Sequence, residues 1–171
     1  MTDSLDITLW NVQWAKAKRA QFVKGRLLQC PADVLCVTEG YPDMLKDSGH
    51  LISSDADHGY NTTDDRRKVM LWSKNPWSSV DTGNGLDFPS GRFVSGITDT
   101  PLGSIRFVGV CIPWKSAHVS TGRRDREVWQ DHMMRSKNGS TQRTPQSQLF
   151  CLETSTSAYP TADNQNPLTT V

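Results

Sequence analysis

Two polar side chains stand where predicted strands end. Asn11 follows an apolar stretch that ends in Trp10, and Glu39 closes a stretch from Pro31, just before a loop that opens with Gly40. In an open α/β sheet, side chains just beyond the carboxyl ends of parallel strands face the ligand-binding crevice. A carboxylate there suits Mg²⁺, which keeps several waters and takes further oxygens from a substrate phosphate. Asn11 and Glu39 are therefore the candidate catalytic and metal-binding residues.

The same two positions also have a structural explanation. A Glu after a strand is often the polar start of a loop, and an Asn there is often a turn residue. Position alone leaves both interpretations open, because a fold constrains function only loosely. Two neighbouring features are interpreted more simply. The mixed-sign run from Asp64 to Lys68 is expected to be a solvated turn, and Arg92 is expected near the same edge without an assigned role.

The elements that would bring Asn11 and Glu39 together form a strand–helix–strand unit. The stretch from Leu5 to Trp10 alternates as a strand does, and residues 15–30 combine strong helix formers with apolar residues at helical spacing. Residues 31–39 are almost continuously apolar, as expected for a strand covered on both faces. A crossover of this kind predicts parallel strands that end at a common edge.

The remaining pattern predicts a mixed α/β domain without internal repeats. Its elements are a strand within 49–60, a strand over 67–74, a hairpin over 91–114 and a helix over 121–134. After about Met134 the chain is dominated by Ser, Thr, Gln, Asn and Pro. Such a segment cannot bury enough apolar surface to offset its ordering entropy. We therefore predict a domain over 1–132 and a disordered tail over 133–171.

Length, charge and cysteine content limit the possible partners, metal sites and location of the protein. The chain has 171 residues and a net charge of +1, which is enough for one domain with a core and favours neither nucleic acid nor membrane as a partner. Its four cysteines lack the paired spacing of a zinc site. The sequence contains no membrane-spanning stretch and opens with no secretory signal, so we expect a cytoplasmic protein. The oligomeric state stays open.

The order of these motifs resembles the endonuclease/exonuclease/phosphatase (DNase I-like) superfamily. Its members open with a strand ending in Trp-Asn and a second strand ending in Glu before a loop, as in "ITLWNVQWA" and "PADVLCVTEGYPD" here. The stretches "HGYNTTDDRRKVMLWSK", "GRFVSGITDTPLGSIRFVGVCIPW" and "GRRDREVWQDH" are similar to the family's next strand, hairpin and helix. The resemblance covers about Leu5 to His132.

The resemblance implies a partial four-layer α/β sandwich of two packed sheets with flanking helices, in which the C-terminal half is missing. It also implies hydrolysis of phosphodiesters or phosphomonoesters that depends on Mg²⁺, or on Mn²⁺ in its place, with a phosphate ester or nucleic acid as substrate. By motif, Glu39 would bind the metal, and Asn11 would help to position the metal and the phosphate. The cation would neutralise charge on the phosphoryl oxygens.

Three family features are absent from the sequence. Where many members place a Tyr or His after the hairpin strand, this chain reads "VCIPW", with Cys111. The Gly-Asp-x-Asn motif and the closing Asp-His pair do not occur, and His118 and His132 precede any place for that pair. We therefore expect a family member of uncertain enzymatic status, with little or no activity as written. The alternative is a non-catalytic module that binds phosphate or nucleic acid.

The missing Gly-Asp-x-Asn motif reappears in a neighbouring reading frame. Codons for Leu152 to Ser157 can be chosen so that this frame reads Gly-Asp-Phe-Asn-Gln. The same shift from Met133 to Ser140 permits a continued helix. The tail from about Met133 would then be out-of-frame translation of a longer gene, with a genuine disordered linker as the alternative.

Overall fold

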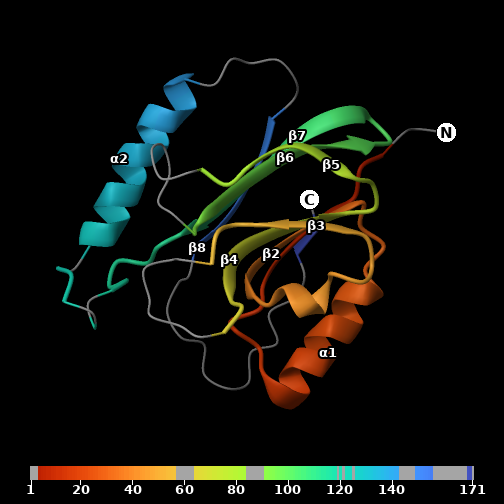
Figure 1. The fold of residues 1–171 in the computed structure, drawn as a ribbon, viewed down its shortest axis with the longest axis horizontal. Helices are drawn as coiled ribbons and strands as arrows, with labels where there is room; N and C mark the ends of the chain where they lie inside the picture. Colours follow the sequence, from red (N-terminus) through yellow and green to blue (C-terminus); the bar gives the residue numbers. More distant parts are fainter. Residues whose placement is uncertain are drawn as a thin grey trace.

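The computed structural model describes residues 4–56, 64–83, 91–118, 120, 122–124, 126–142, 149–155 and 169–170. Two β-sheets lie one above the other, with the helices α1 and α2 at opposite ends of the stack (Figure 1). The helices are α1 (Ala17–Leu28), the short 3₁₀ helix η1 (Pro42–Met44) and α2 (Glu127–Gln142). The predicted fold, a mixed α/β sandwich of two sheets with flanking helices, is confirmed.

The first sheet has the strand order β3-β4-β2-β1-β9. Its strands are β1 (Ile7–Asn11), β2 (Val34–Gly40), β3 (His50–Ser53), β4 (Arg67–Ser73) and β9 (Thr169–Thr170). β1 and β2 run parallel, as predicted, and α1 connects them. β4 is antiparallel to both β2 and β3, and β9 is antiparallel to β1. β4 therefore begins at the edge where β1 and β2 end.

The second sheet has the strand order β5-β6-β7-β8. Its strands are β5 (Trp77–Asp81), β6 (Phe93–Thr100), β7 (Gly103–Ile112) and β8 (Leu149–Ser155). β6 and β7 form the predicted hairpin, which turns at Gly103, where φ is +100°. A φ of this sign favours glycine because it has no Cβ. β5 was not predicted, since its exposed serines lack an alternating apolar pattern.

Two apolar layers hold these elements together. Val23 and Leu27 of α1 pack with the side chains of β2 and β4 that point away from the second sheet, such as Leu35 and Met70. A second cluster fills the space between the sheets, and it consists of Ile7, Val34, Cys36, Val69, Leu71, Val94, Ile105, Phe107 and Cys111. Successive residues of β2 alternate between these two layers, because side chains in a strand alternate between faces. Burial on both faces explains the continuous apolar run of β2.

The described residues after 132 comprise the end of α2 and the strands β8 and β9. α2 continues to Gln142, and β8 runs parallel to β7 from Leu149 opposite Arg106 to Ser155 opposite Ile112. These two stretches lie within the predicted tail, of which residues 143–148, 156–168 and 171 lie outside the described residues. Strand pairing is made by backbone groups, so a polar sequence does not prevent it. The division of the chain at residue 132 stays a prediction.

Candidate metal and phosphate site

The ends of β1 and β2 and the start of β4 meet at one edge of the first sheet, called the rim below. Asn11 lies opposite Thr38 in the parallel pair, and Gly40 lies opposite Arg67 in the antiparallel pair. The backbone that follows β1 stays beside the end of β2, because the N–H of Val12 donates to the carbonyl oxygen of Thr38 at 3.0 Å. The rim is therefore built by three neighbouring strands and one turn.

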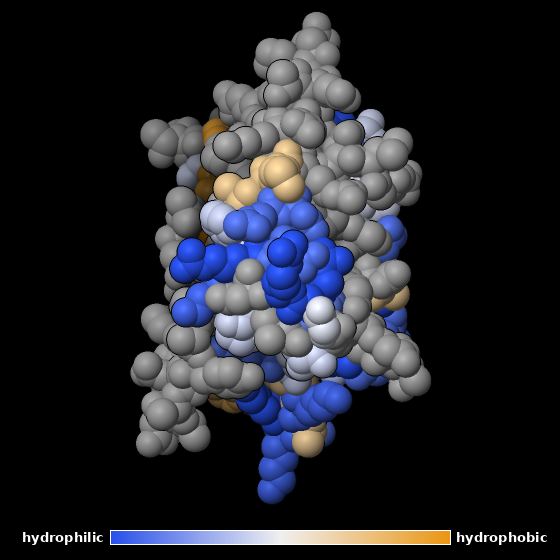
Figure 2. All heavy atoms as spheres, turned by 90° about the vertical axis from the view of Figure 1, so that its left-hand side faces the viewer, coloured by the Kyte–Doolittle hydropathy of each residue, from blue (hydrophilic) through white to orange (hydrophobic). Residues whose placement is uncertain are grey.

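The second sheet reaches the same edge. Ser73, at the far end of β4, shares a 2.9 Å hydrogen bond with Thr98 of β6. Towards the rim, Gly109 of β7 lies directly against Val69 of β4. Because β4 contacts β6 at its far end and β7 towards the rim, the start of β6 and the end of β7 lie over the rim. Figure 2 looks onto the side where β7 ends and α2 begins, and hydrophilic residues gather in the middle of this face.

Glu39 is buried at the rim, with 8% of its surface exposed. Its φ is +55°, in the left-handed region that residues other than glycine seldom adopt. Gln13 and Trp14 in the turn after β1 share this feature, with φ of +50° and +54°. The N–H of Trp14 donates to the carbonyl oxygen of Glu39 at 2.6 Å, which joins the two strained segments. Backbone strain of this kind concentrates at functional sites.

The carboxylate of Glu39 is paired with an ammonium group. Lys68 Nζ donates to Glu39 Oε1 at 2.8 Å, and the two side chains are only 9% and 10% exposed. The same Nζ lies 4.7 Å from the centre of the Trp14 ring. This distance permits a cation–π attraction, which adds to the ion pair. The first residues of β4 therefore place a buried cation against the predicted metal ligand.

Asn11 is half-buried, and its side chain closes the turn after β1. Its Oδ1 accepts a 2.9 Å hydrogen bond from the N–H of Gln13. This is the turn role that the sequence left open as an alternative, although an amide oxygen has two lone pairs and can accept a second partner. The backbones of Asn11 and Glu39 are on neighbouring strands, whereas their side chains bond to different partners. Joint binding of one cation by both is part of the proposal below.

Charged and aromatic side chains surround the buried pair. The Cζ of Arg66 lies 5.3 Å from the centre of the Trp14 ring, and the Tyr41 ring meets Trp14 edge-on at 6.5 Å. Asp64 forms ion pairs with Arg66 and with Lys16. Desolvation raises the pKa of the Asp64 carboxyl, but the hydrogen bond and charge of Arg66 and the charge of Lys16 outweigh it, so the pKa lies below its usual value. Asp64 is thus an ion-pair partner of these cations.

The second sheet contributes a buried guanidinium. Arg92, directly before β6, is 3% exposed, and its Nη1 donates to the carbonyl oxygen of Cys111 at 3.4 Å. His132 of α2 is fully buried, and its pKa falls to about 4, chiefly through desolvation and then through the charge of Arg92. His132 is therefore neutral at pH 7. Cys111 is buried at the place where the resemblance expects Tyr or His.

The oxygen donors at the rim fit a weakly held divalent cation. Mg²⁺ is usually bound by one or two carboxylates, with waters and substrate phosphate in the remaining positions. The carboxylate of Glu39 and the amide oxygen of Asn11 are hard donors of this type. Within the part of the chain that the structure describes, no group of three or more His, Cys, Asp or Glu side chains is arranged to hold a metal. Such a cation would depend on the substrate for much of its binding.

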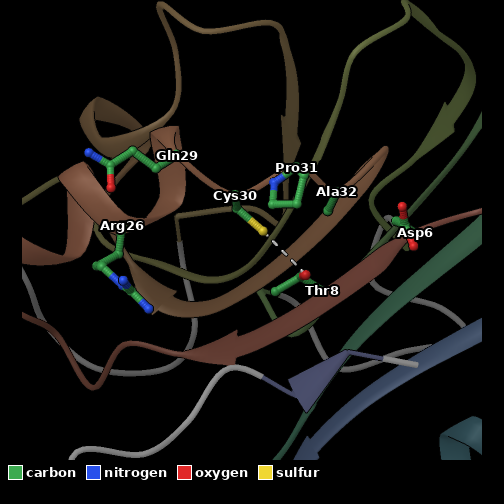
Figure 3. Close-up of a pocket in the computed structure, with 7 residues that line it drawn as sticks. All are labelled: Asp6, Thr8, Arg26, Gln29, Cys30, Pro31 and Ala32. Carbon is green, nitrogen blue, oxygen red and sulfur yellow. Dashed lines mark hydrogen bonds between the residues drawn. The ribbon is translucent and has the colours of Figure 1, made fainter.

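A separate hollow of about 320 Å³ lies at the opposite end of the same strands (Figure 3). Thr8 and Cys30 share a hydrogen bond in its lining, with 3.3 Å between Oγ1 and Sγ. Thr8 is near the start of β1, and Ala32 in the lining precedes β2. This hollow is therefore not part of the rim.

Lys68 and Trp14 are the rim residues that the sequence analysis missed. The predicted strand over 67–74 included Lys68, but the run from Asp64 to Lys68 was interpreted as solvated, whereas Lys68 is only 7% exposed in β4. A signal was available, because Lys68 alternates with Met70 and Trp72, which both pack in the layer beneath α1. No comparable pattern marks Trp14, since its position depends on a turn with positive φ.

The fold and the rim define the class of protein. The family model described as "Endonuclease/Exonuclease/phosphatase family" matches residues 8–151. The chain belongs to this family, which confirms the resemblance found in the sequence. A comparison with curated protein sequences found no match.

Three solved structures illustrate the likeness. A sphingomyelinase C from Streptomyces griseocarneus is similar with a TM-score of 0.58 and 11% identity over 89% of this chain and 64% of its own. A beta toxin from Staphylococcus aureus with bound magnesium ions has a TM-score of 0.58 and 13% identity. The match covers 89% of this chain and 64% of the toxin. A 3′ phosphatase from Neisseria bound to a product DNA hairpin has a TM-score of 0.55 and 20% identity. The match covers 88% of this chain and 57% of the phosphatase.

These likenesses show the fold. The chain spans 57% to 64% of the length of the three structures, and 11% to 20% of the aligned residues are identical. Among the described residues, no helix is long and apolar enough to cross a membrane. The cytoplasmic location stays a prediction.

Proposed function

We propose that the rim is the metal- and phosphate-binding part of a phosphoesterase site that hydrolyses phosphodiester or phosphomonoester bonds. Glu39 binds Mg²⁺, or Mn²⁺ in its place, and Asn11 helps to position the cation and the substrate phosphate. The observation that carries this proposal is the buried carboxylate of Glu39 at the end of β2, in a strained backbone conformation. Family membership and the magnesium ions of a structural neighbour support the choice of metal.

The chain's own residues supply binding and orientation. The cation, when bound, neutralises charge on the phosphoryl oxygens. In the metal-free protein, Lys68 holds the carboxylate of Glu39 through its hydrogen bond at 2.8 Å. Asn11 holds the turn after β1, which joins Trp14 to the backbone of Glu39 and places its ring beside the Lys68 ammonium. Arg92 offers a positive charge from the second sheet, and a guanidinium suits phosphate oxygens.

We expect little hydrolysis by the chain as written. The sequence lacks the family's Gly-Asp-x-Asn motif and has no Asp-His pair at the family's closing position, and the resemblance implies that those groups would hold and activate the attacking water. One carboxylate also binds Mg²⁺ weakly. Metal binding is therefore the more sensitive test of the site, and cleavage of plasmid DNA and of a phosphomonoester is the second.

The test compares wild-type protein with Glu39→Gln, and with Asp47→Asn as a control on an exposed carboxylate. Titration with Mn²⁺, followed by the EPR signal of the free ion, should show that Glu39→Gln binds at least tenfold more weakly, while Asp47→Asn matches wild type. Equal affinity in wild type and Glu39→Gln would refute the proposed site. Cleavage that needs Mg²⁺ and disappears in Glu39→Gln would support the site and refute the expected inactivity.

A second candidate function is a non-catalytic module that binds phosphate or nucleic acid. The observation in its favour is that Lys68 already neutralises Glu39, while Arg66 stacks on Trp14 close by. Cations and an aromatic ring can bind a nucleic-acid strand without a metal. DNA retention that is unchanged by EDTA and is lost in Arg66→Ala would favour this function over the first.

We also propose that the chain from about Met133 is translated out of frame. The position of β8 supports this, because its last residue, Ser155, lies beside Ile112 at the end of β7. Translation in the neighbouring frame would therefore put Gly-Asp-Phe-Asn near the end of a strand that reaches the rim. The coding DNA decides the matter. Codons that cannot give Gly-Asp-Phe-Asn in the neighbouring frame would refute the idea.

A further inference from the structure

Lys68 stands out at the rim because it is the buried cation that shares a carboxylate with the proposed metal. Its Nζ is 2.8 Å from Glu39 Oε1 and 4.7 Å from the Trp14 ring centre, and its side chain is 9% exposed. Three other cations beside this pair have carboxylate partners of their own. Arg66 and Lys16 pair with Asp64, and Arg67 pairs with Asp65.

We propose that Lys68 is a built-in counter-cation that occupies Glu39 in the metal-free protein and that a divalent cation must displace. This rests on the proposed function, since it takes Glu39 as the metal ligand. Lys68 therefore sets how strongly the site binds metal. It also keeps the buried carboxylate neutralised while no metal is bound.

Two physical arguments support displacement over sharing. A divalent ion on the same carboxylate would lie within a few ångströms of the ammonium, and like charges repel strongly where little water screens them. The ammonium is also tethered to β4, directly beside β2, so it competes at a high effective concentration. Metal binding must therefore overcome a hydrogen-bonded ion pair before the cation gains the carboxylate.

The Trp14 ring gives the displaced ammonium a place to remain. Nζ already lies at cation–π distance from this ring, so a small rotation of the Lys68 side chain can break the bond to Glu39 and keep the aromatic contact. Breaking a buried pair without such an alternative leaves an uncompensated charge, which is strongly destabilising. This arrangement thus has two states. Without the metal, Lys68 bonds to Glu39, and with the metal, Lys68 keeps only its contact with the Trp14 ring.

The first experiment compares Mn²⁺ affinity and metal-induced stabilisation in four proteins. These are wild type, Lys68→Met, Lys68→Arg and the double variant Lys68→Met with Glu39→Gln. Lys68→Met should bind Mn²⁺ at least tenfold more tightly than wild type, and Mn²⁺ should raise its Tm by more, because the metal now neutralises Glu39. Lys68→Arg should match wild type, and the double variant should lose the gain. Unchanged or weaker affinity in Lys68→Met would overturn the proposal.

The second experiment needs no variant at Lys68 and remains valid if Lys68→Met does not fold. Wild-type protein is acetylated at lysines with and without saturating Mn²⁺, and modification is followed by mass spectrometry. Lys68 should react at least threefold faster with Mn²⁺. Lys74, which pairs with Asp33 and is 52% exposed, is the control and should not change. Equal reaction of Lys68 in both conditions would overturn displacement.

The results separate the two proposals. If wild type and Glu39→Gln bind Mn²⁺ equally, the proposed function fails and the role of Lys68 fails with it. If binding depends on Glu39 but Lys68→Met does not bind more tightly, only the role of Lys68 is refuted. Glu39-dependent binding that is measurable in wild type and at least tenfold tighter in Lys68→Met supports both.

Discussion

The contact between the two sheets can be tested at Gly109, where β7 passes over β4. A Cβ added at this position would stand 2.8 Å from Val69 Cγ2 and 3.1 Å from Leu71 Cδ2. Both neighbours are fully buried, and Val69 cannot swing away easily because a β-branched side chain has few rotamers. Gly109→Ala must therefore push the sheets apart or force a strained rotamer. Overpacking of this kind costs about 1–3 kcal/mol of unfolding free energy.

The measurement is urea unfolding followed by far-UV circular dichroism. Gly25→Ala in α1 is the matched control, because a Cβ there meets nothing within 4 Å. In the control, the better helix propensity of alanine should stabilise the protein by about 0.5–1 kcal/mol. The two Gly→Ala changes should thus shift stability in opposite directions.

A double variant identifies the cause of the loss at Gly109. If the Val69 methyl is the obstacle, Gly109→Ala combined with Val69→Ala should lose less stability than the sum of the two single variants. A coupling of about 0.5–3 kcal/mol is typical of residues in contact. A Gly109→Ala protein as stable as wild type would refute the close packing of the sheets, and with it the common rim. Strict additivity would show that Val69 is not the obstacle.

Three further predictions follow from the same structure. Thr98→Val removes the hydroxyl that bonds to buried Ser73 between the sheets, so it should cost about 1–3 kcal/mol in urea unfolding, and an unchanged midpoint would contradict the bond. The folded pKa of His132 lies near 4, below its ordinary 6.5, so stability present above pH 6.5 should fall by about 3 kcal/mol as pH drops to 4. In His132→Gln this drop, measured as unfolding free energy against pH, should be largely absent, and an equally steep loss would rule out His132 as its source. Lys74→Ala breaks the ion pair with Asp33, in which the lysine side chain is 52% exposed. The loss of unfolding free energy, measured by thermal unfolding, should therefore be below about 1 kcal/mol. A larger loss would show that solvent screens the pair less than its exposure indicates.

The parts of the fold that follow from short-range patterns were predictable from the sequence. The alternation before Asn11 and the apolar run before Glu39 predicted β1, β2 and their parallel pairing, and the turn residues near Gly103 predicted the β6–β7 hairpin. Boundaries differed by a few residues, as for β1, which runs Ile7–Asn11 instead of Leu5–Trp10. β5 and β8 were missed because their stability comes from pairing with a neighbour, which leaves little trace in a polar sequence.

The sequence by itself determined which residue types could do chemistry at the rim and to which family the chain belongs. The motifs around Asn11 and Glu39 carry that information because strand ends and the residues beyond them are adjacent in the chain. Only the tertiary structure decided what these side chains contact. Lys68 reaches Glu39 from another strand, and Trp14 reaches both through a turn with positive φ. Such contacts depend on backbone angles and on pairing between distant segments, and no local pattern of residues encodes them.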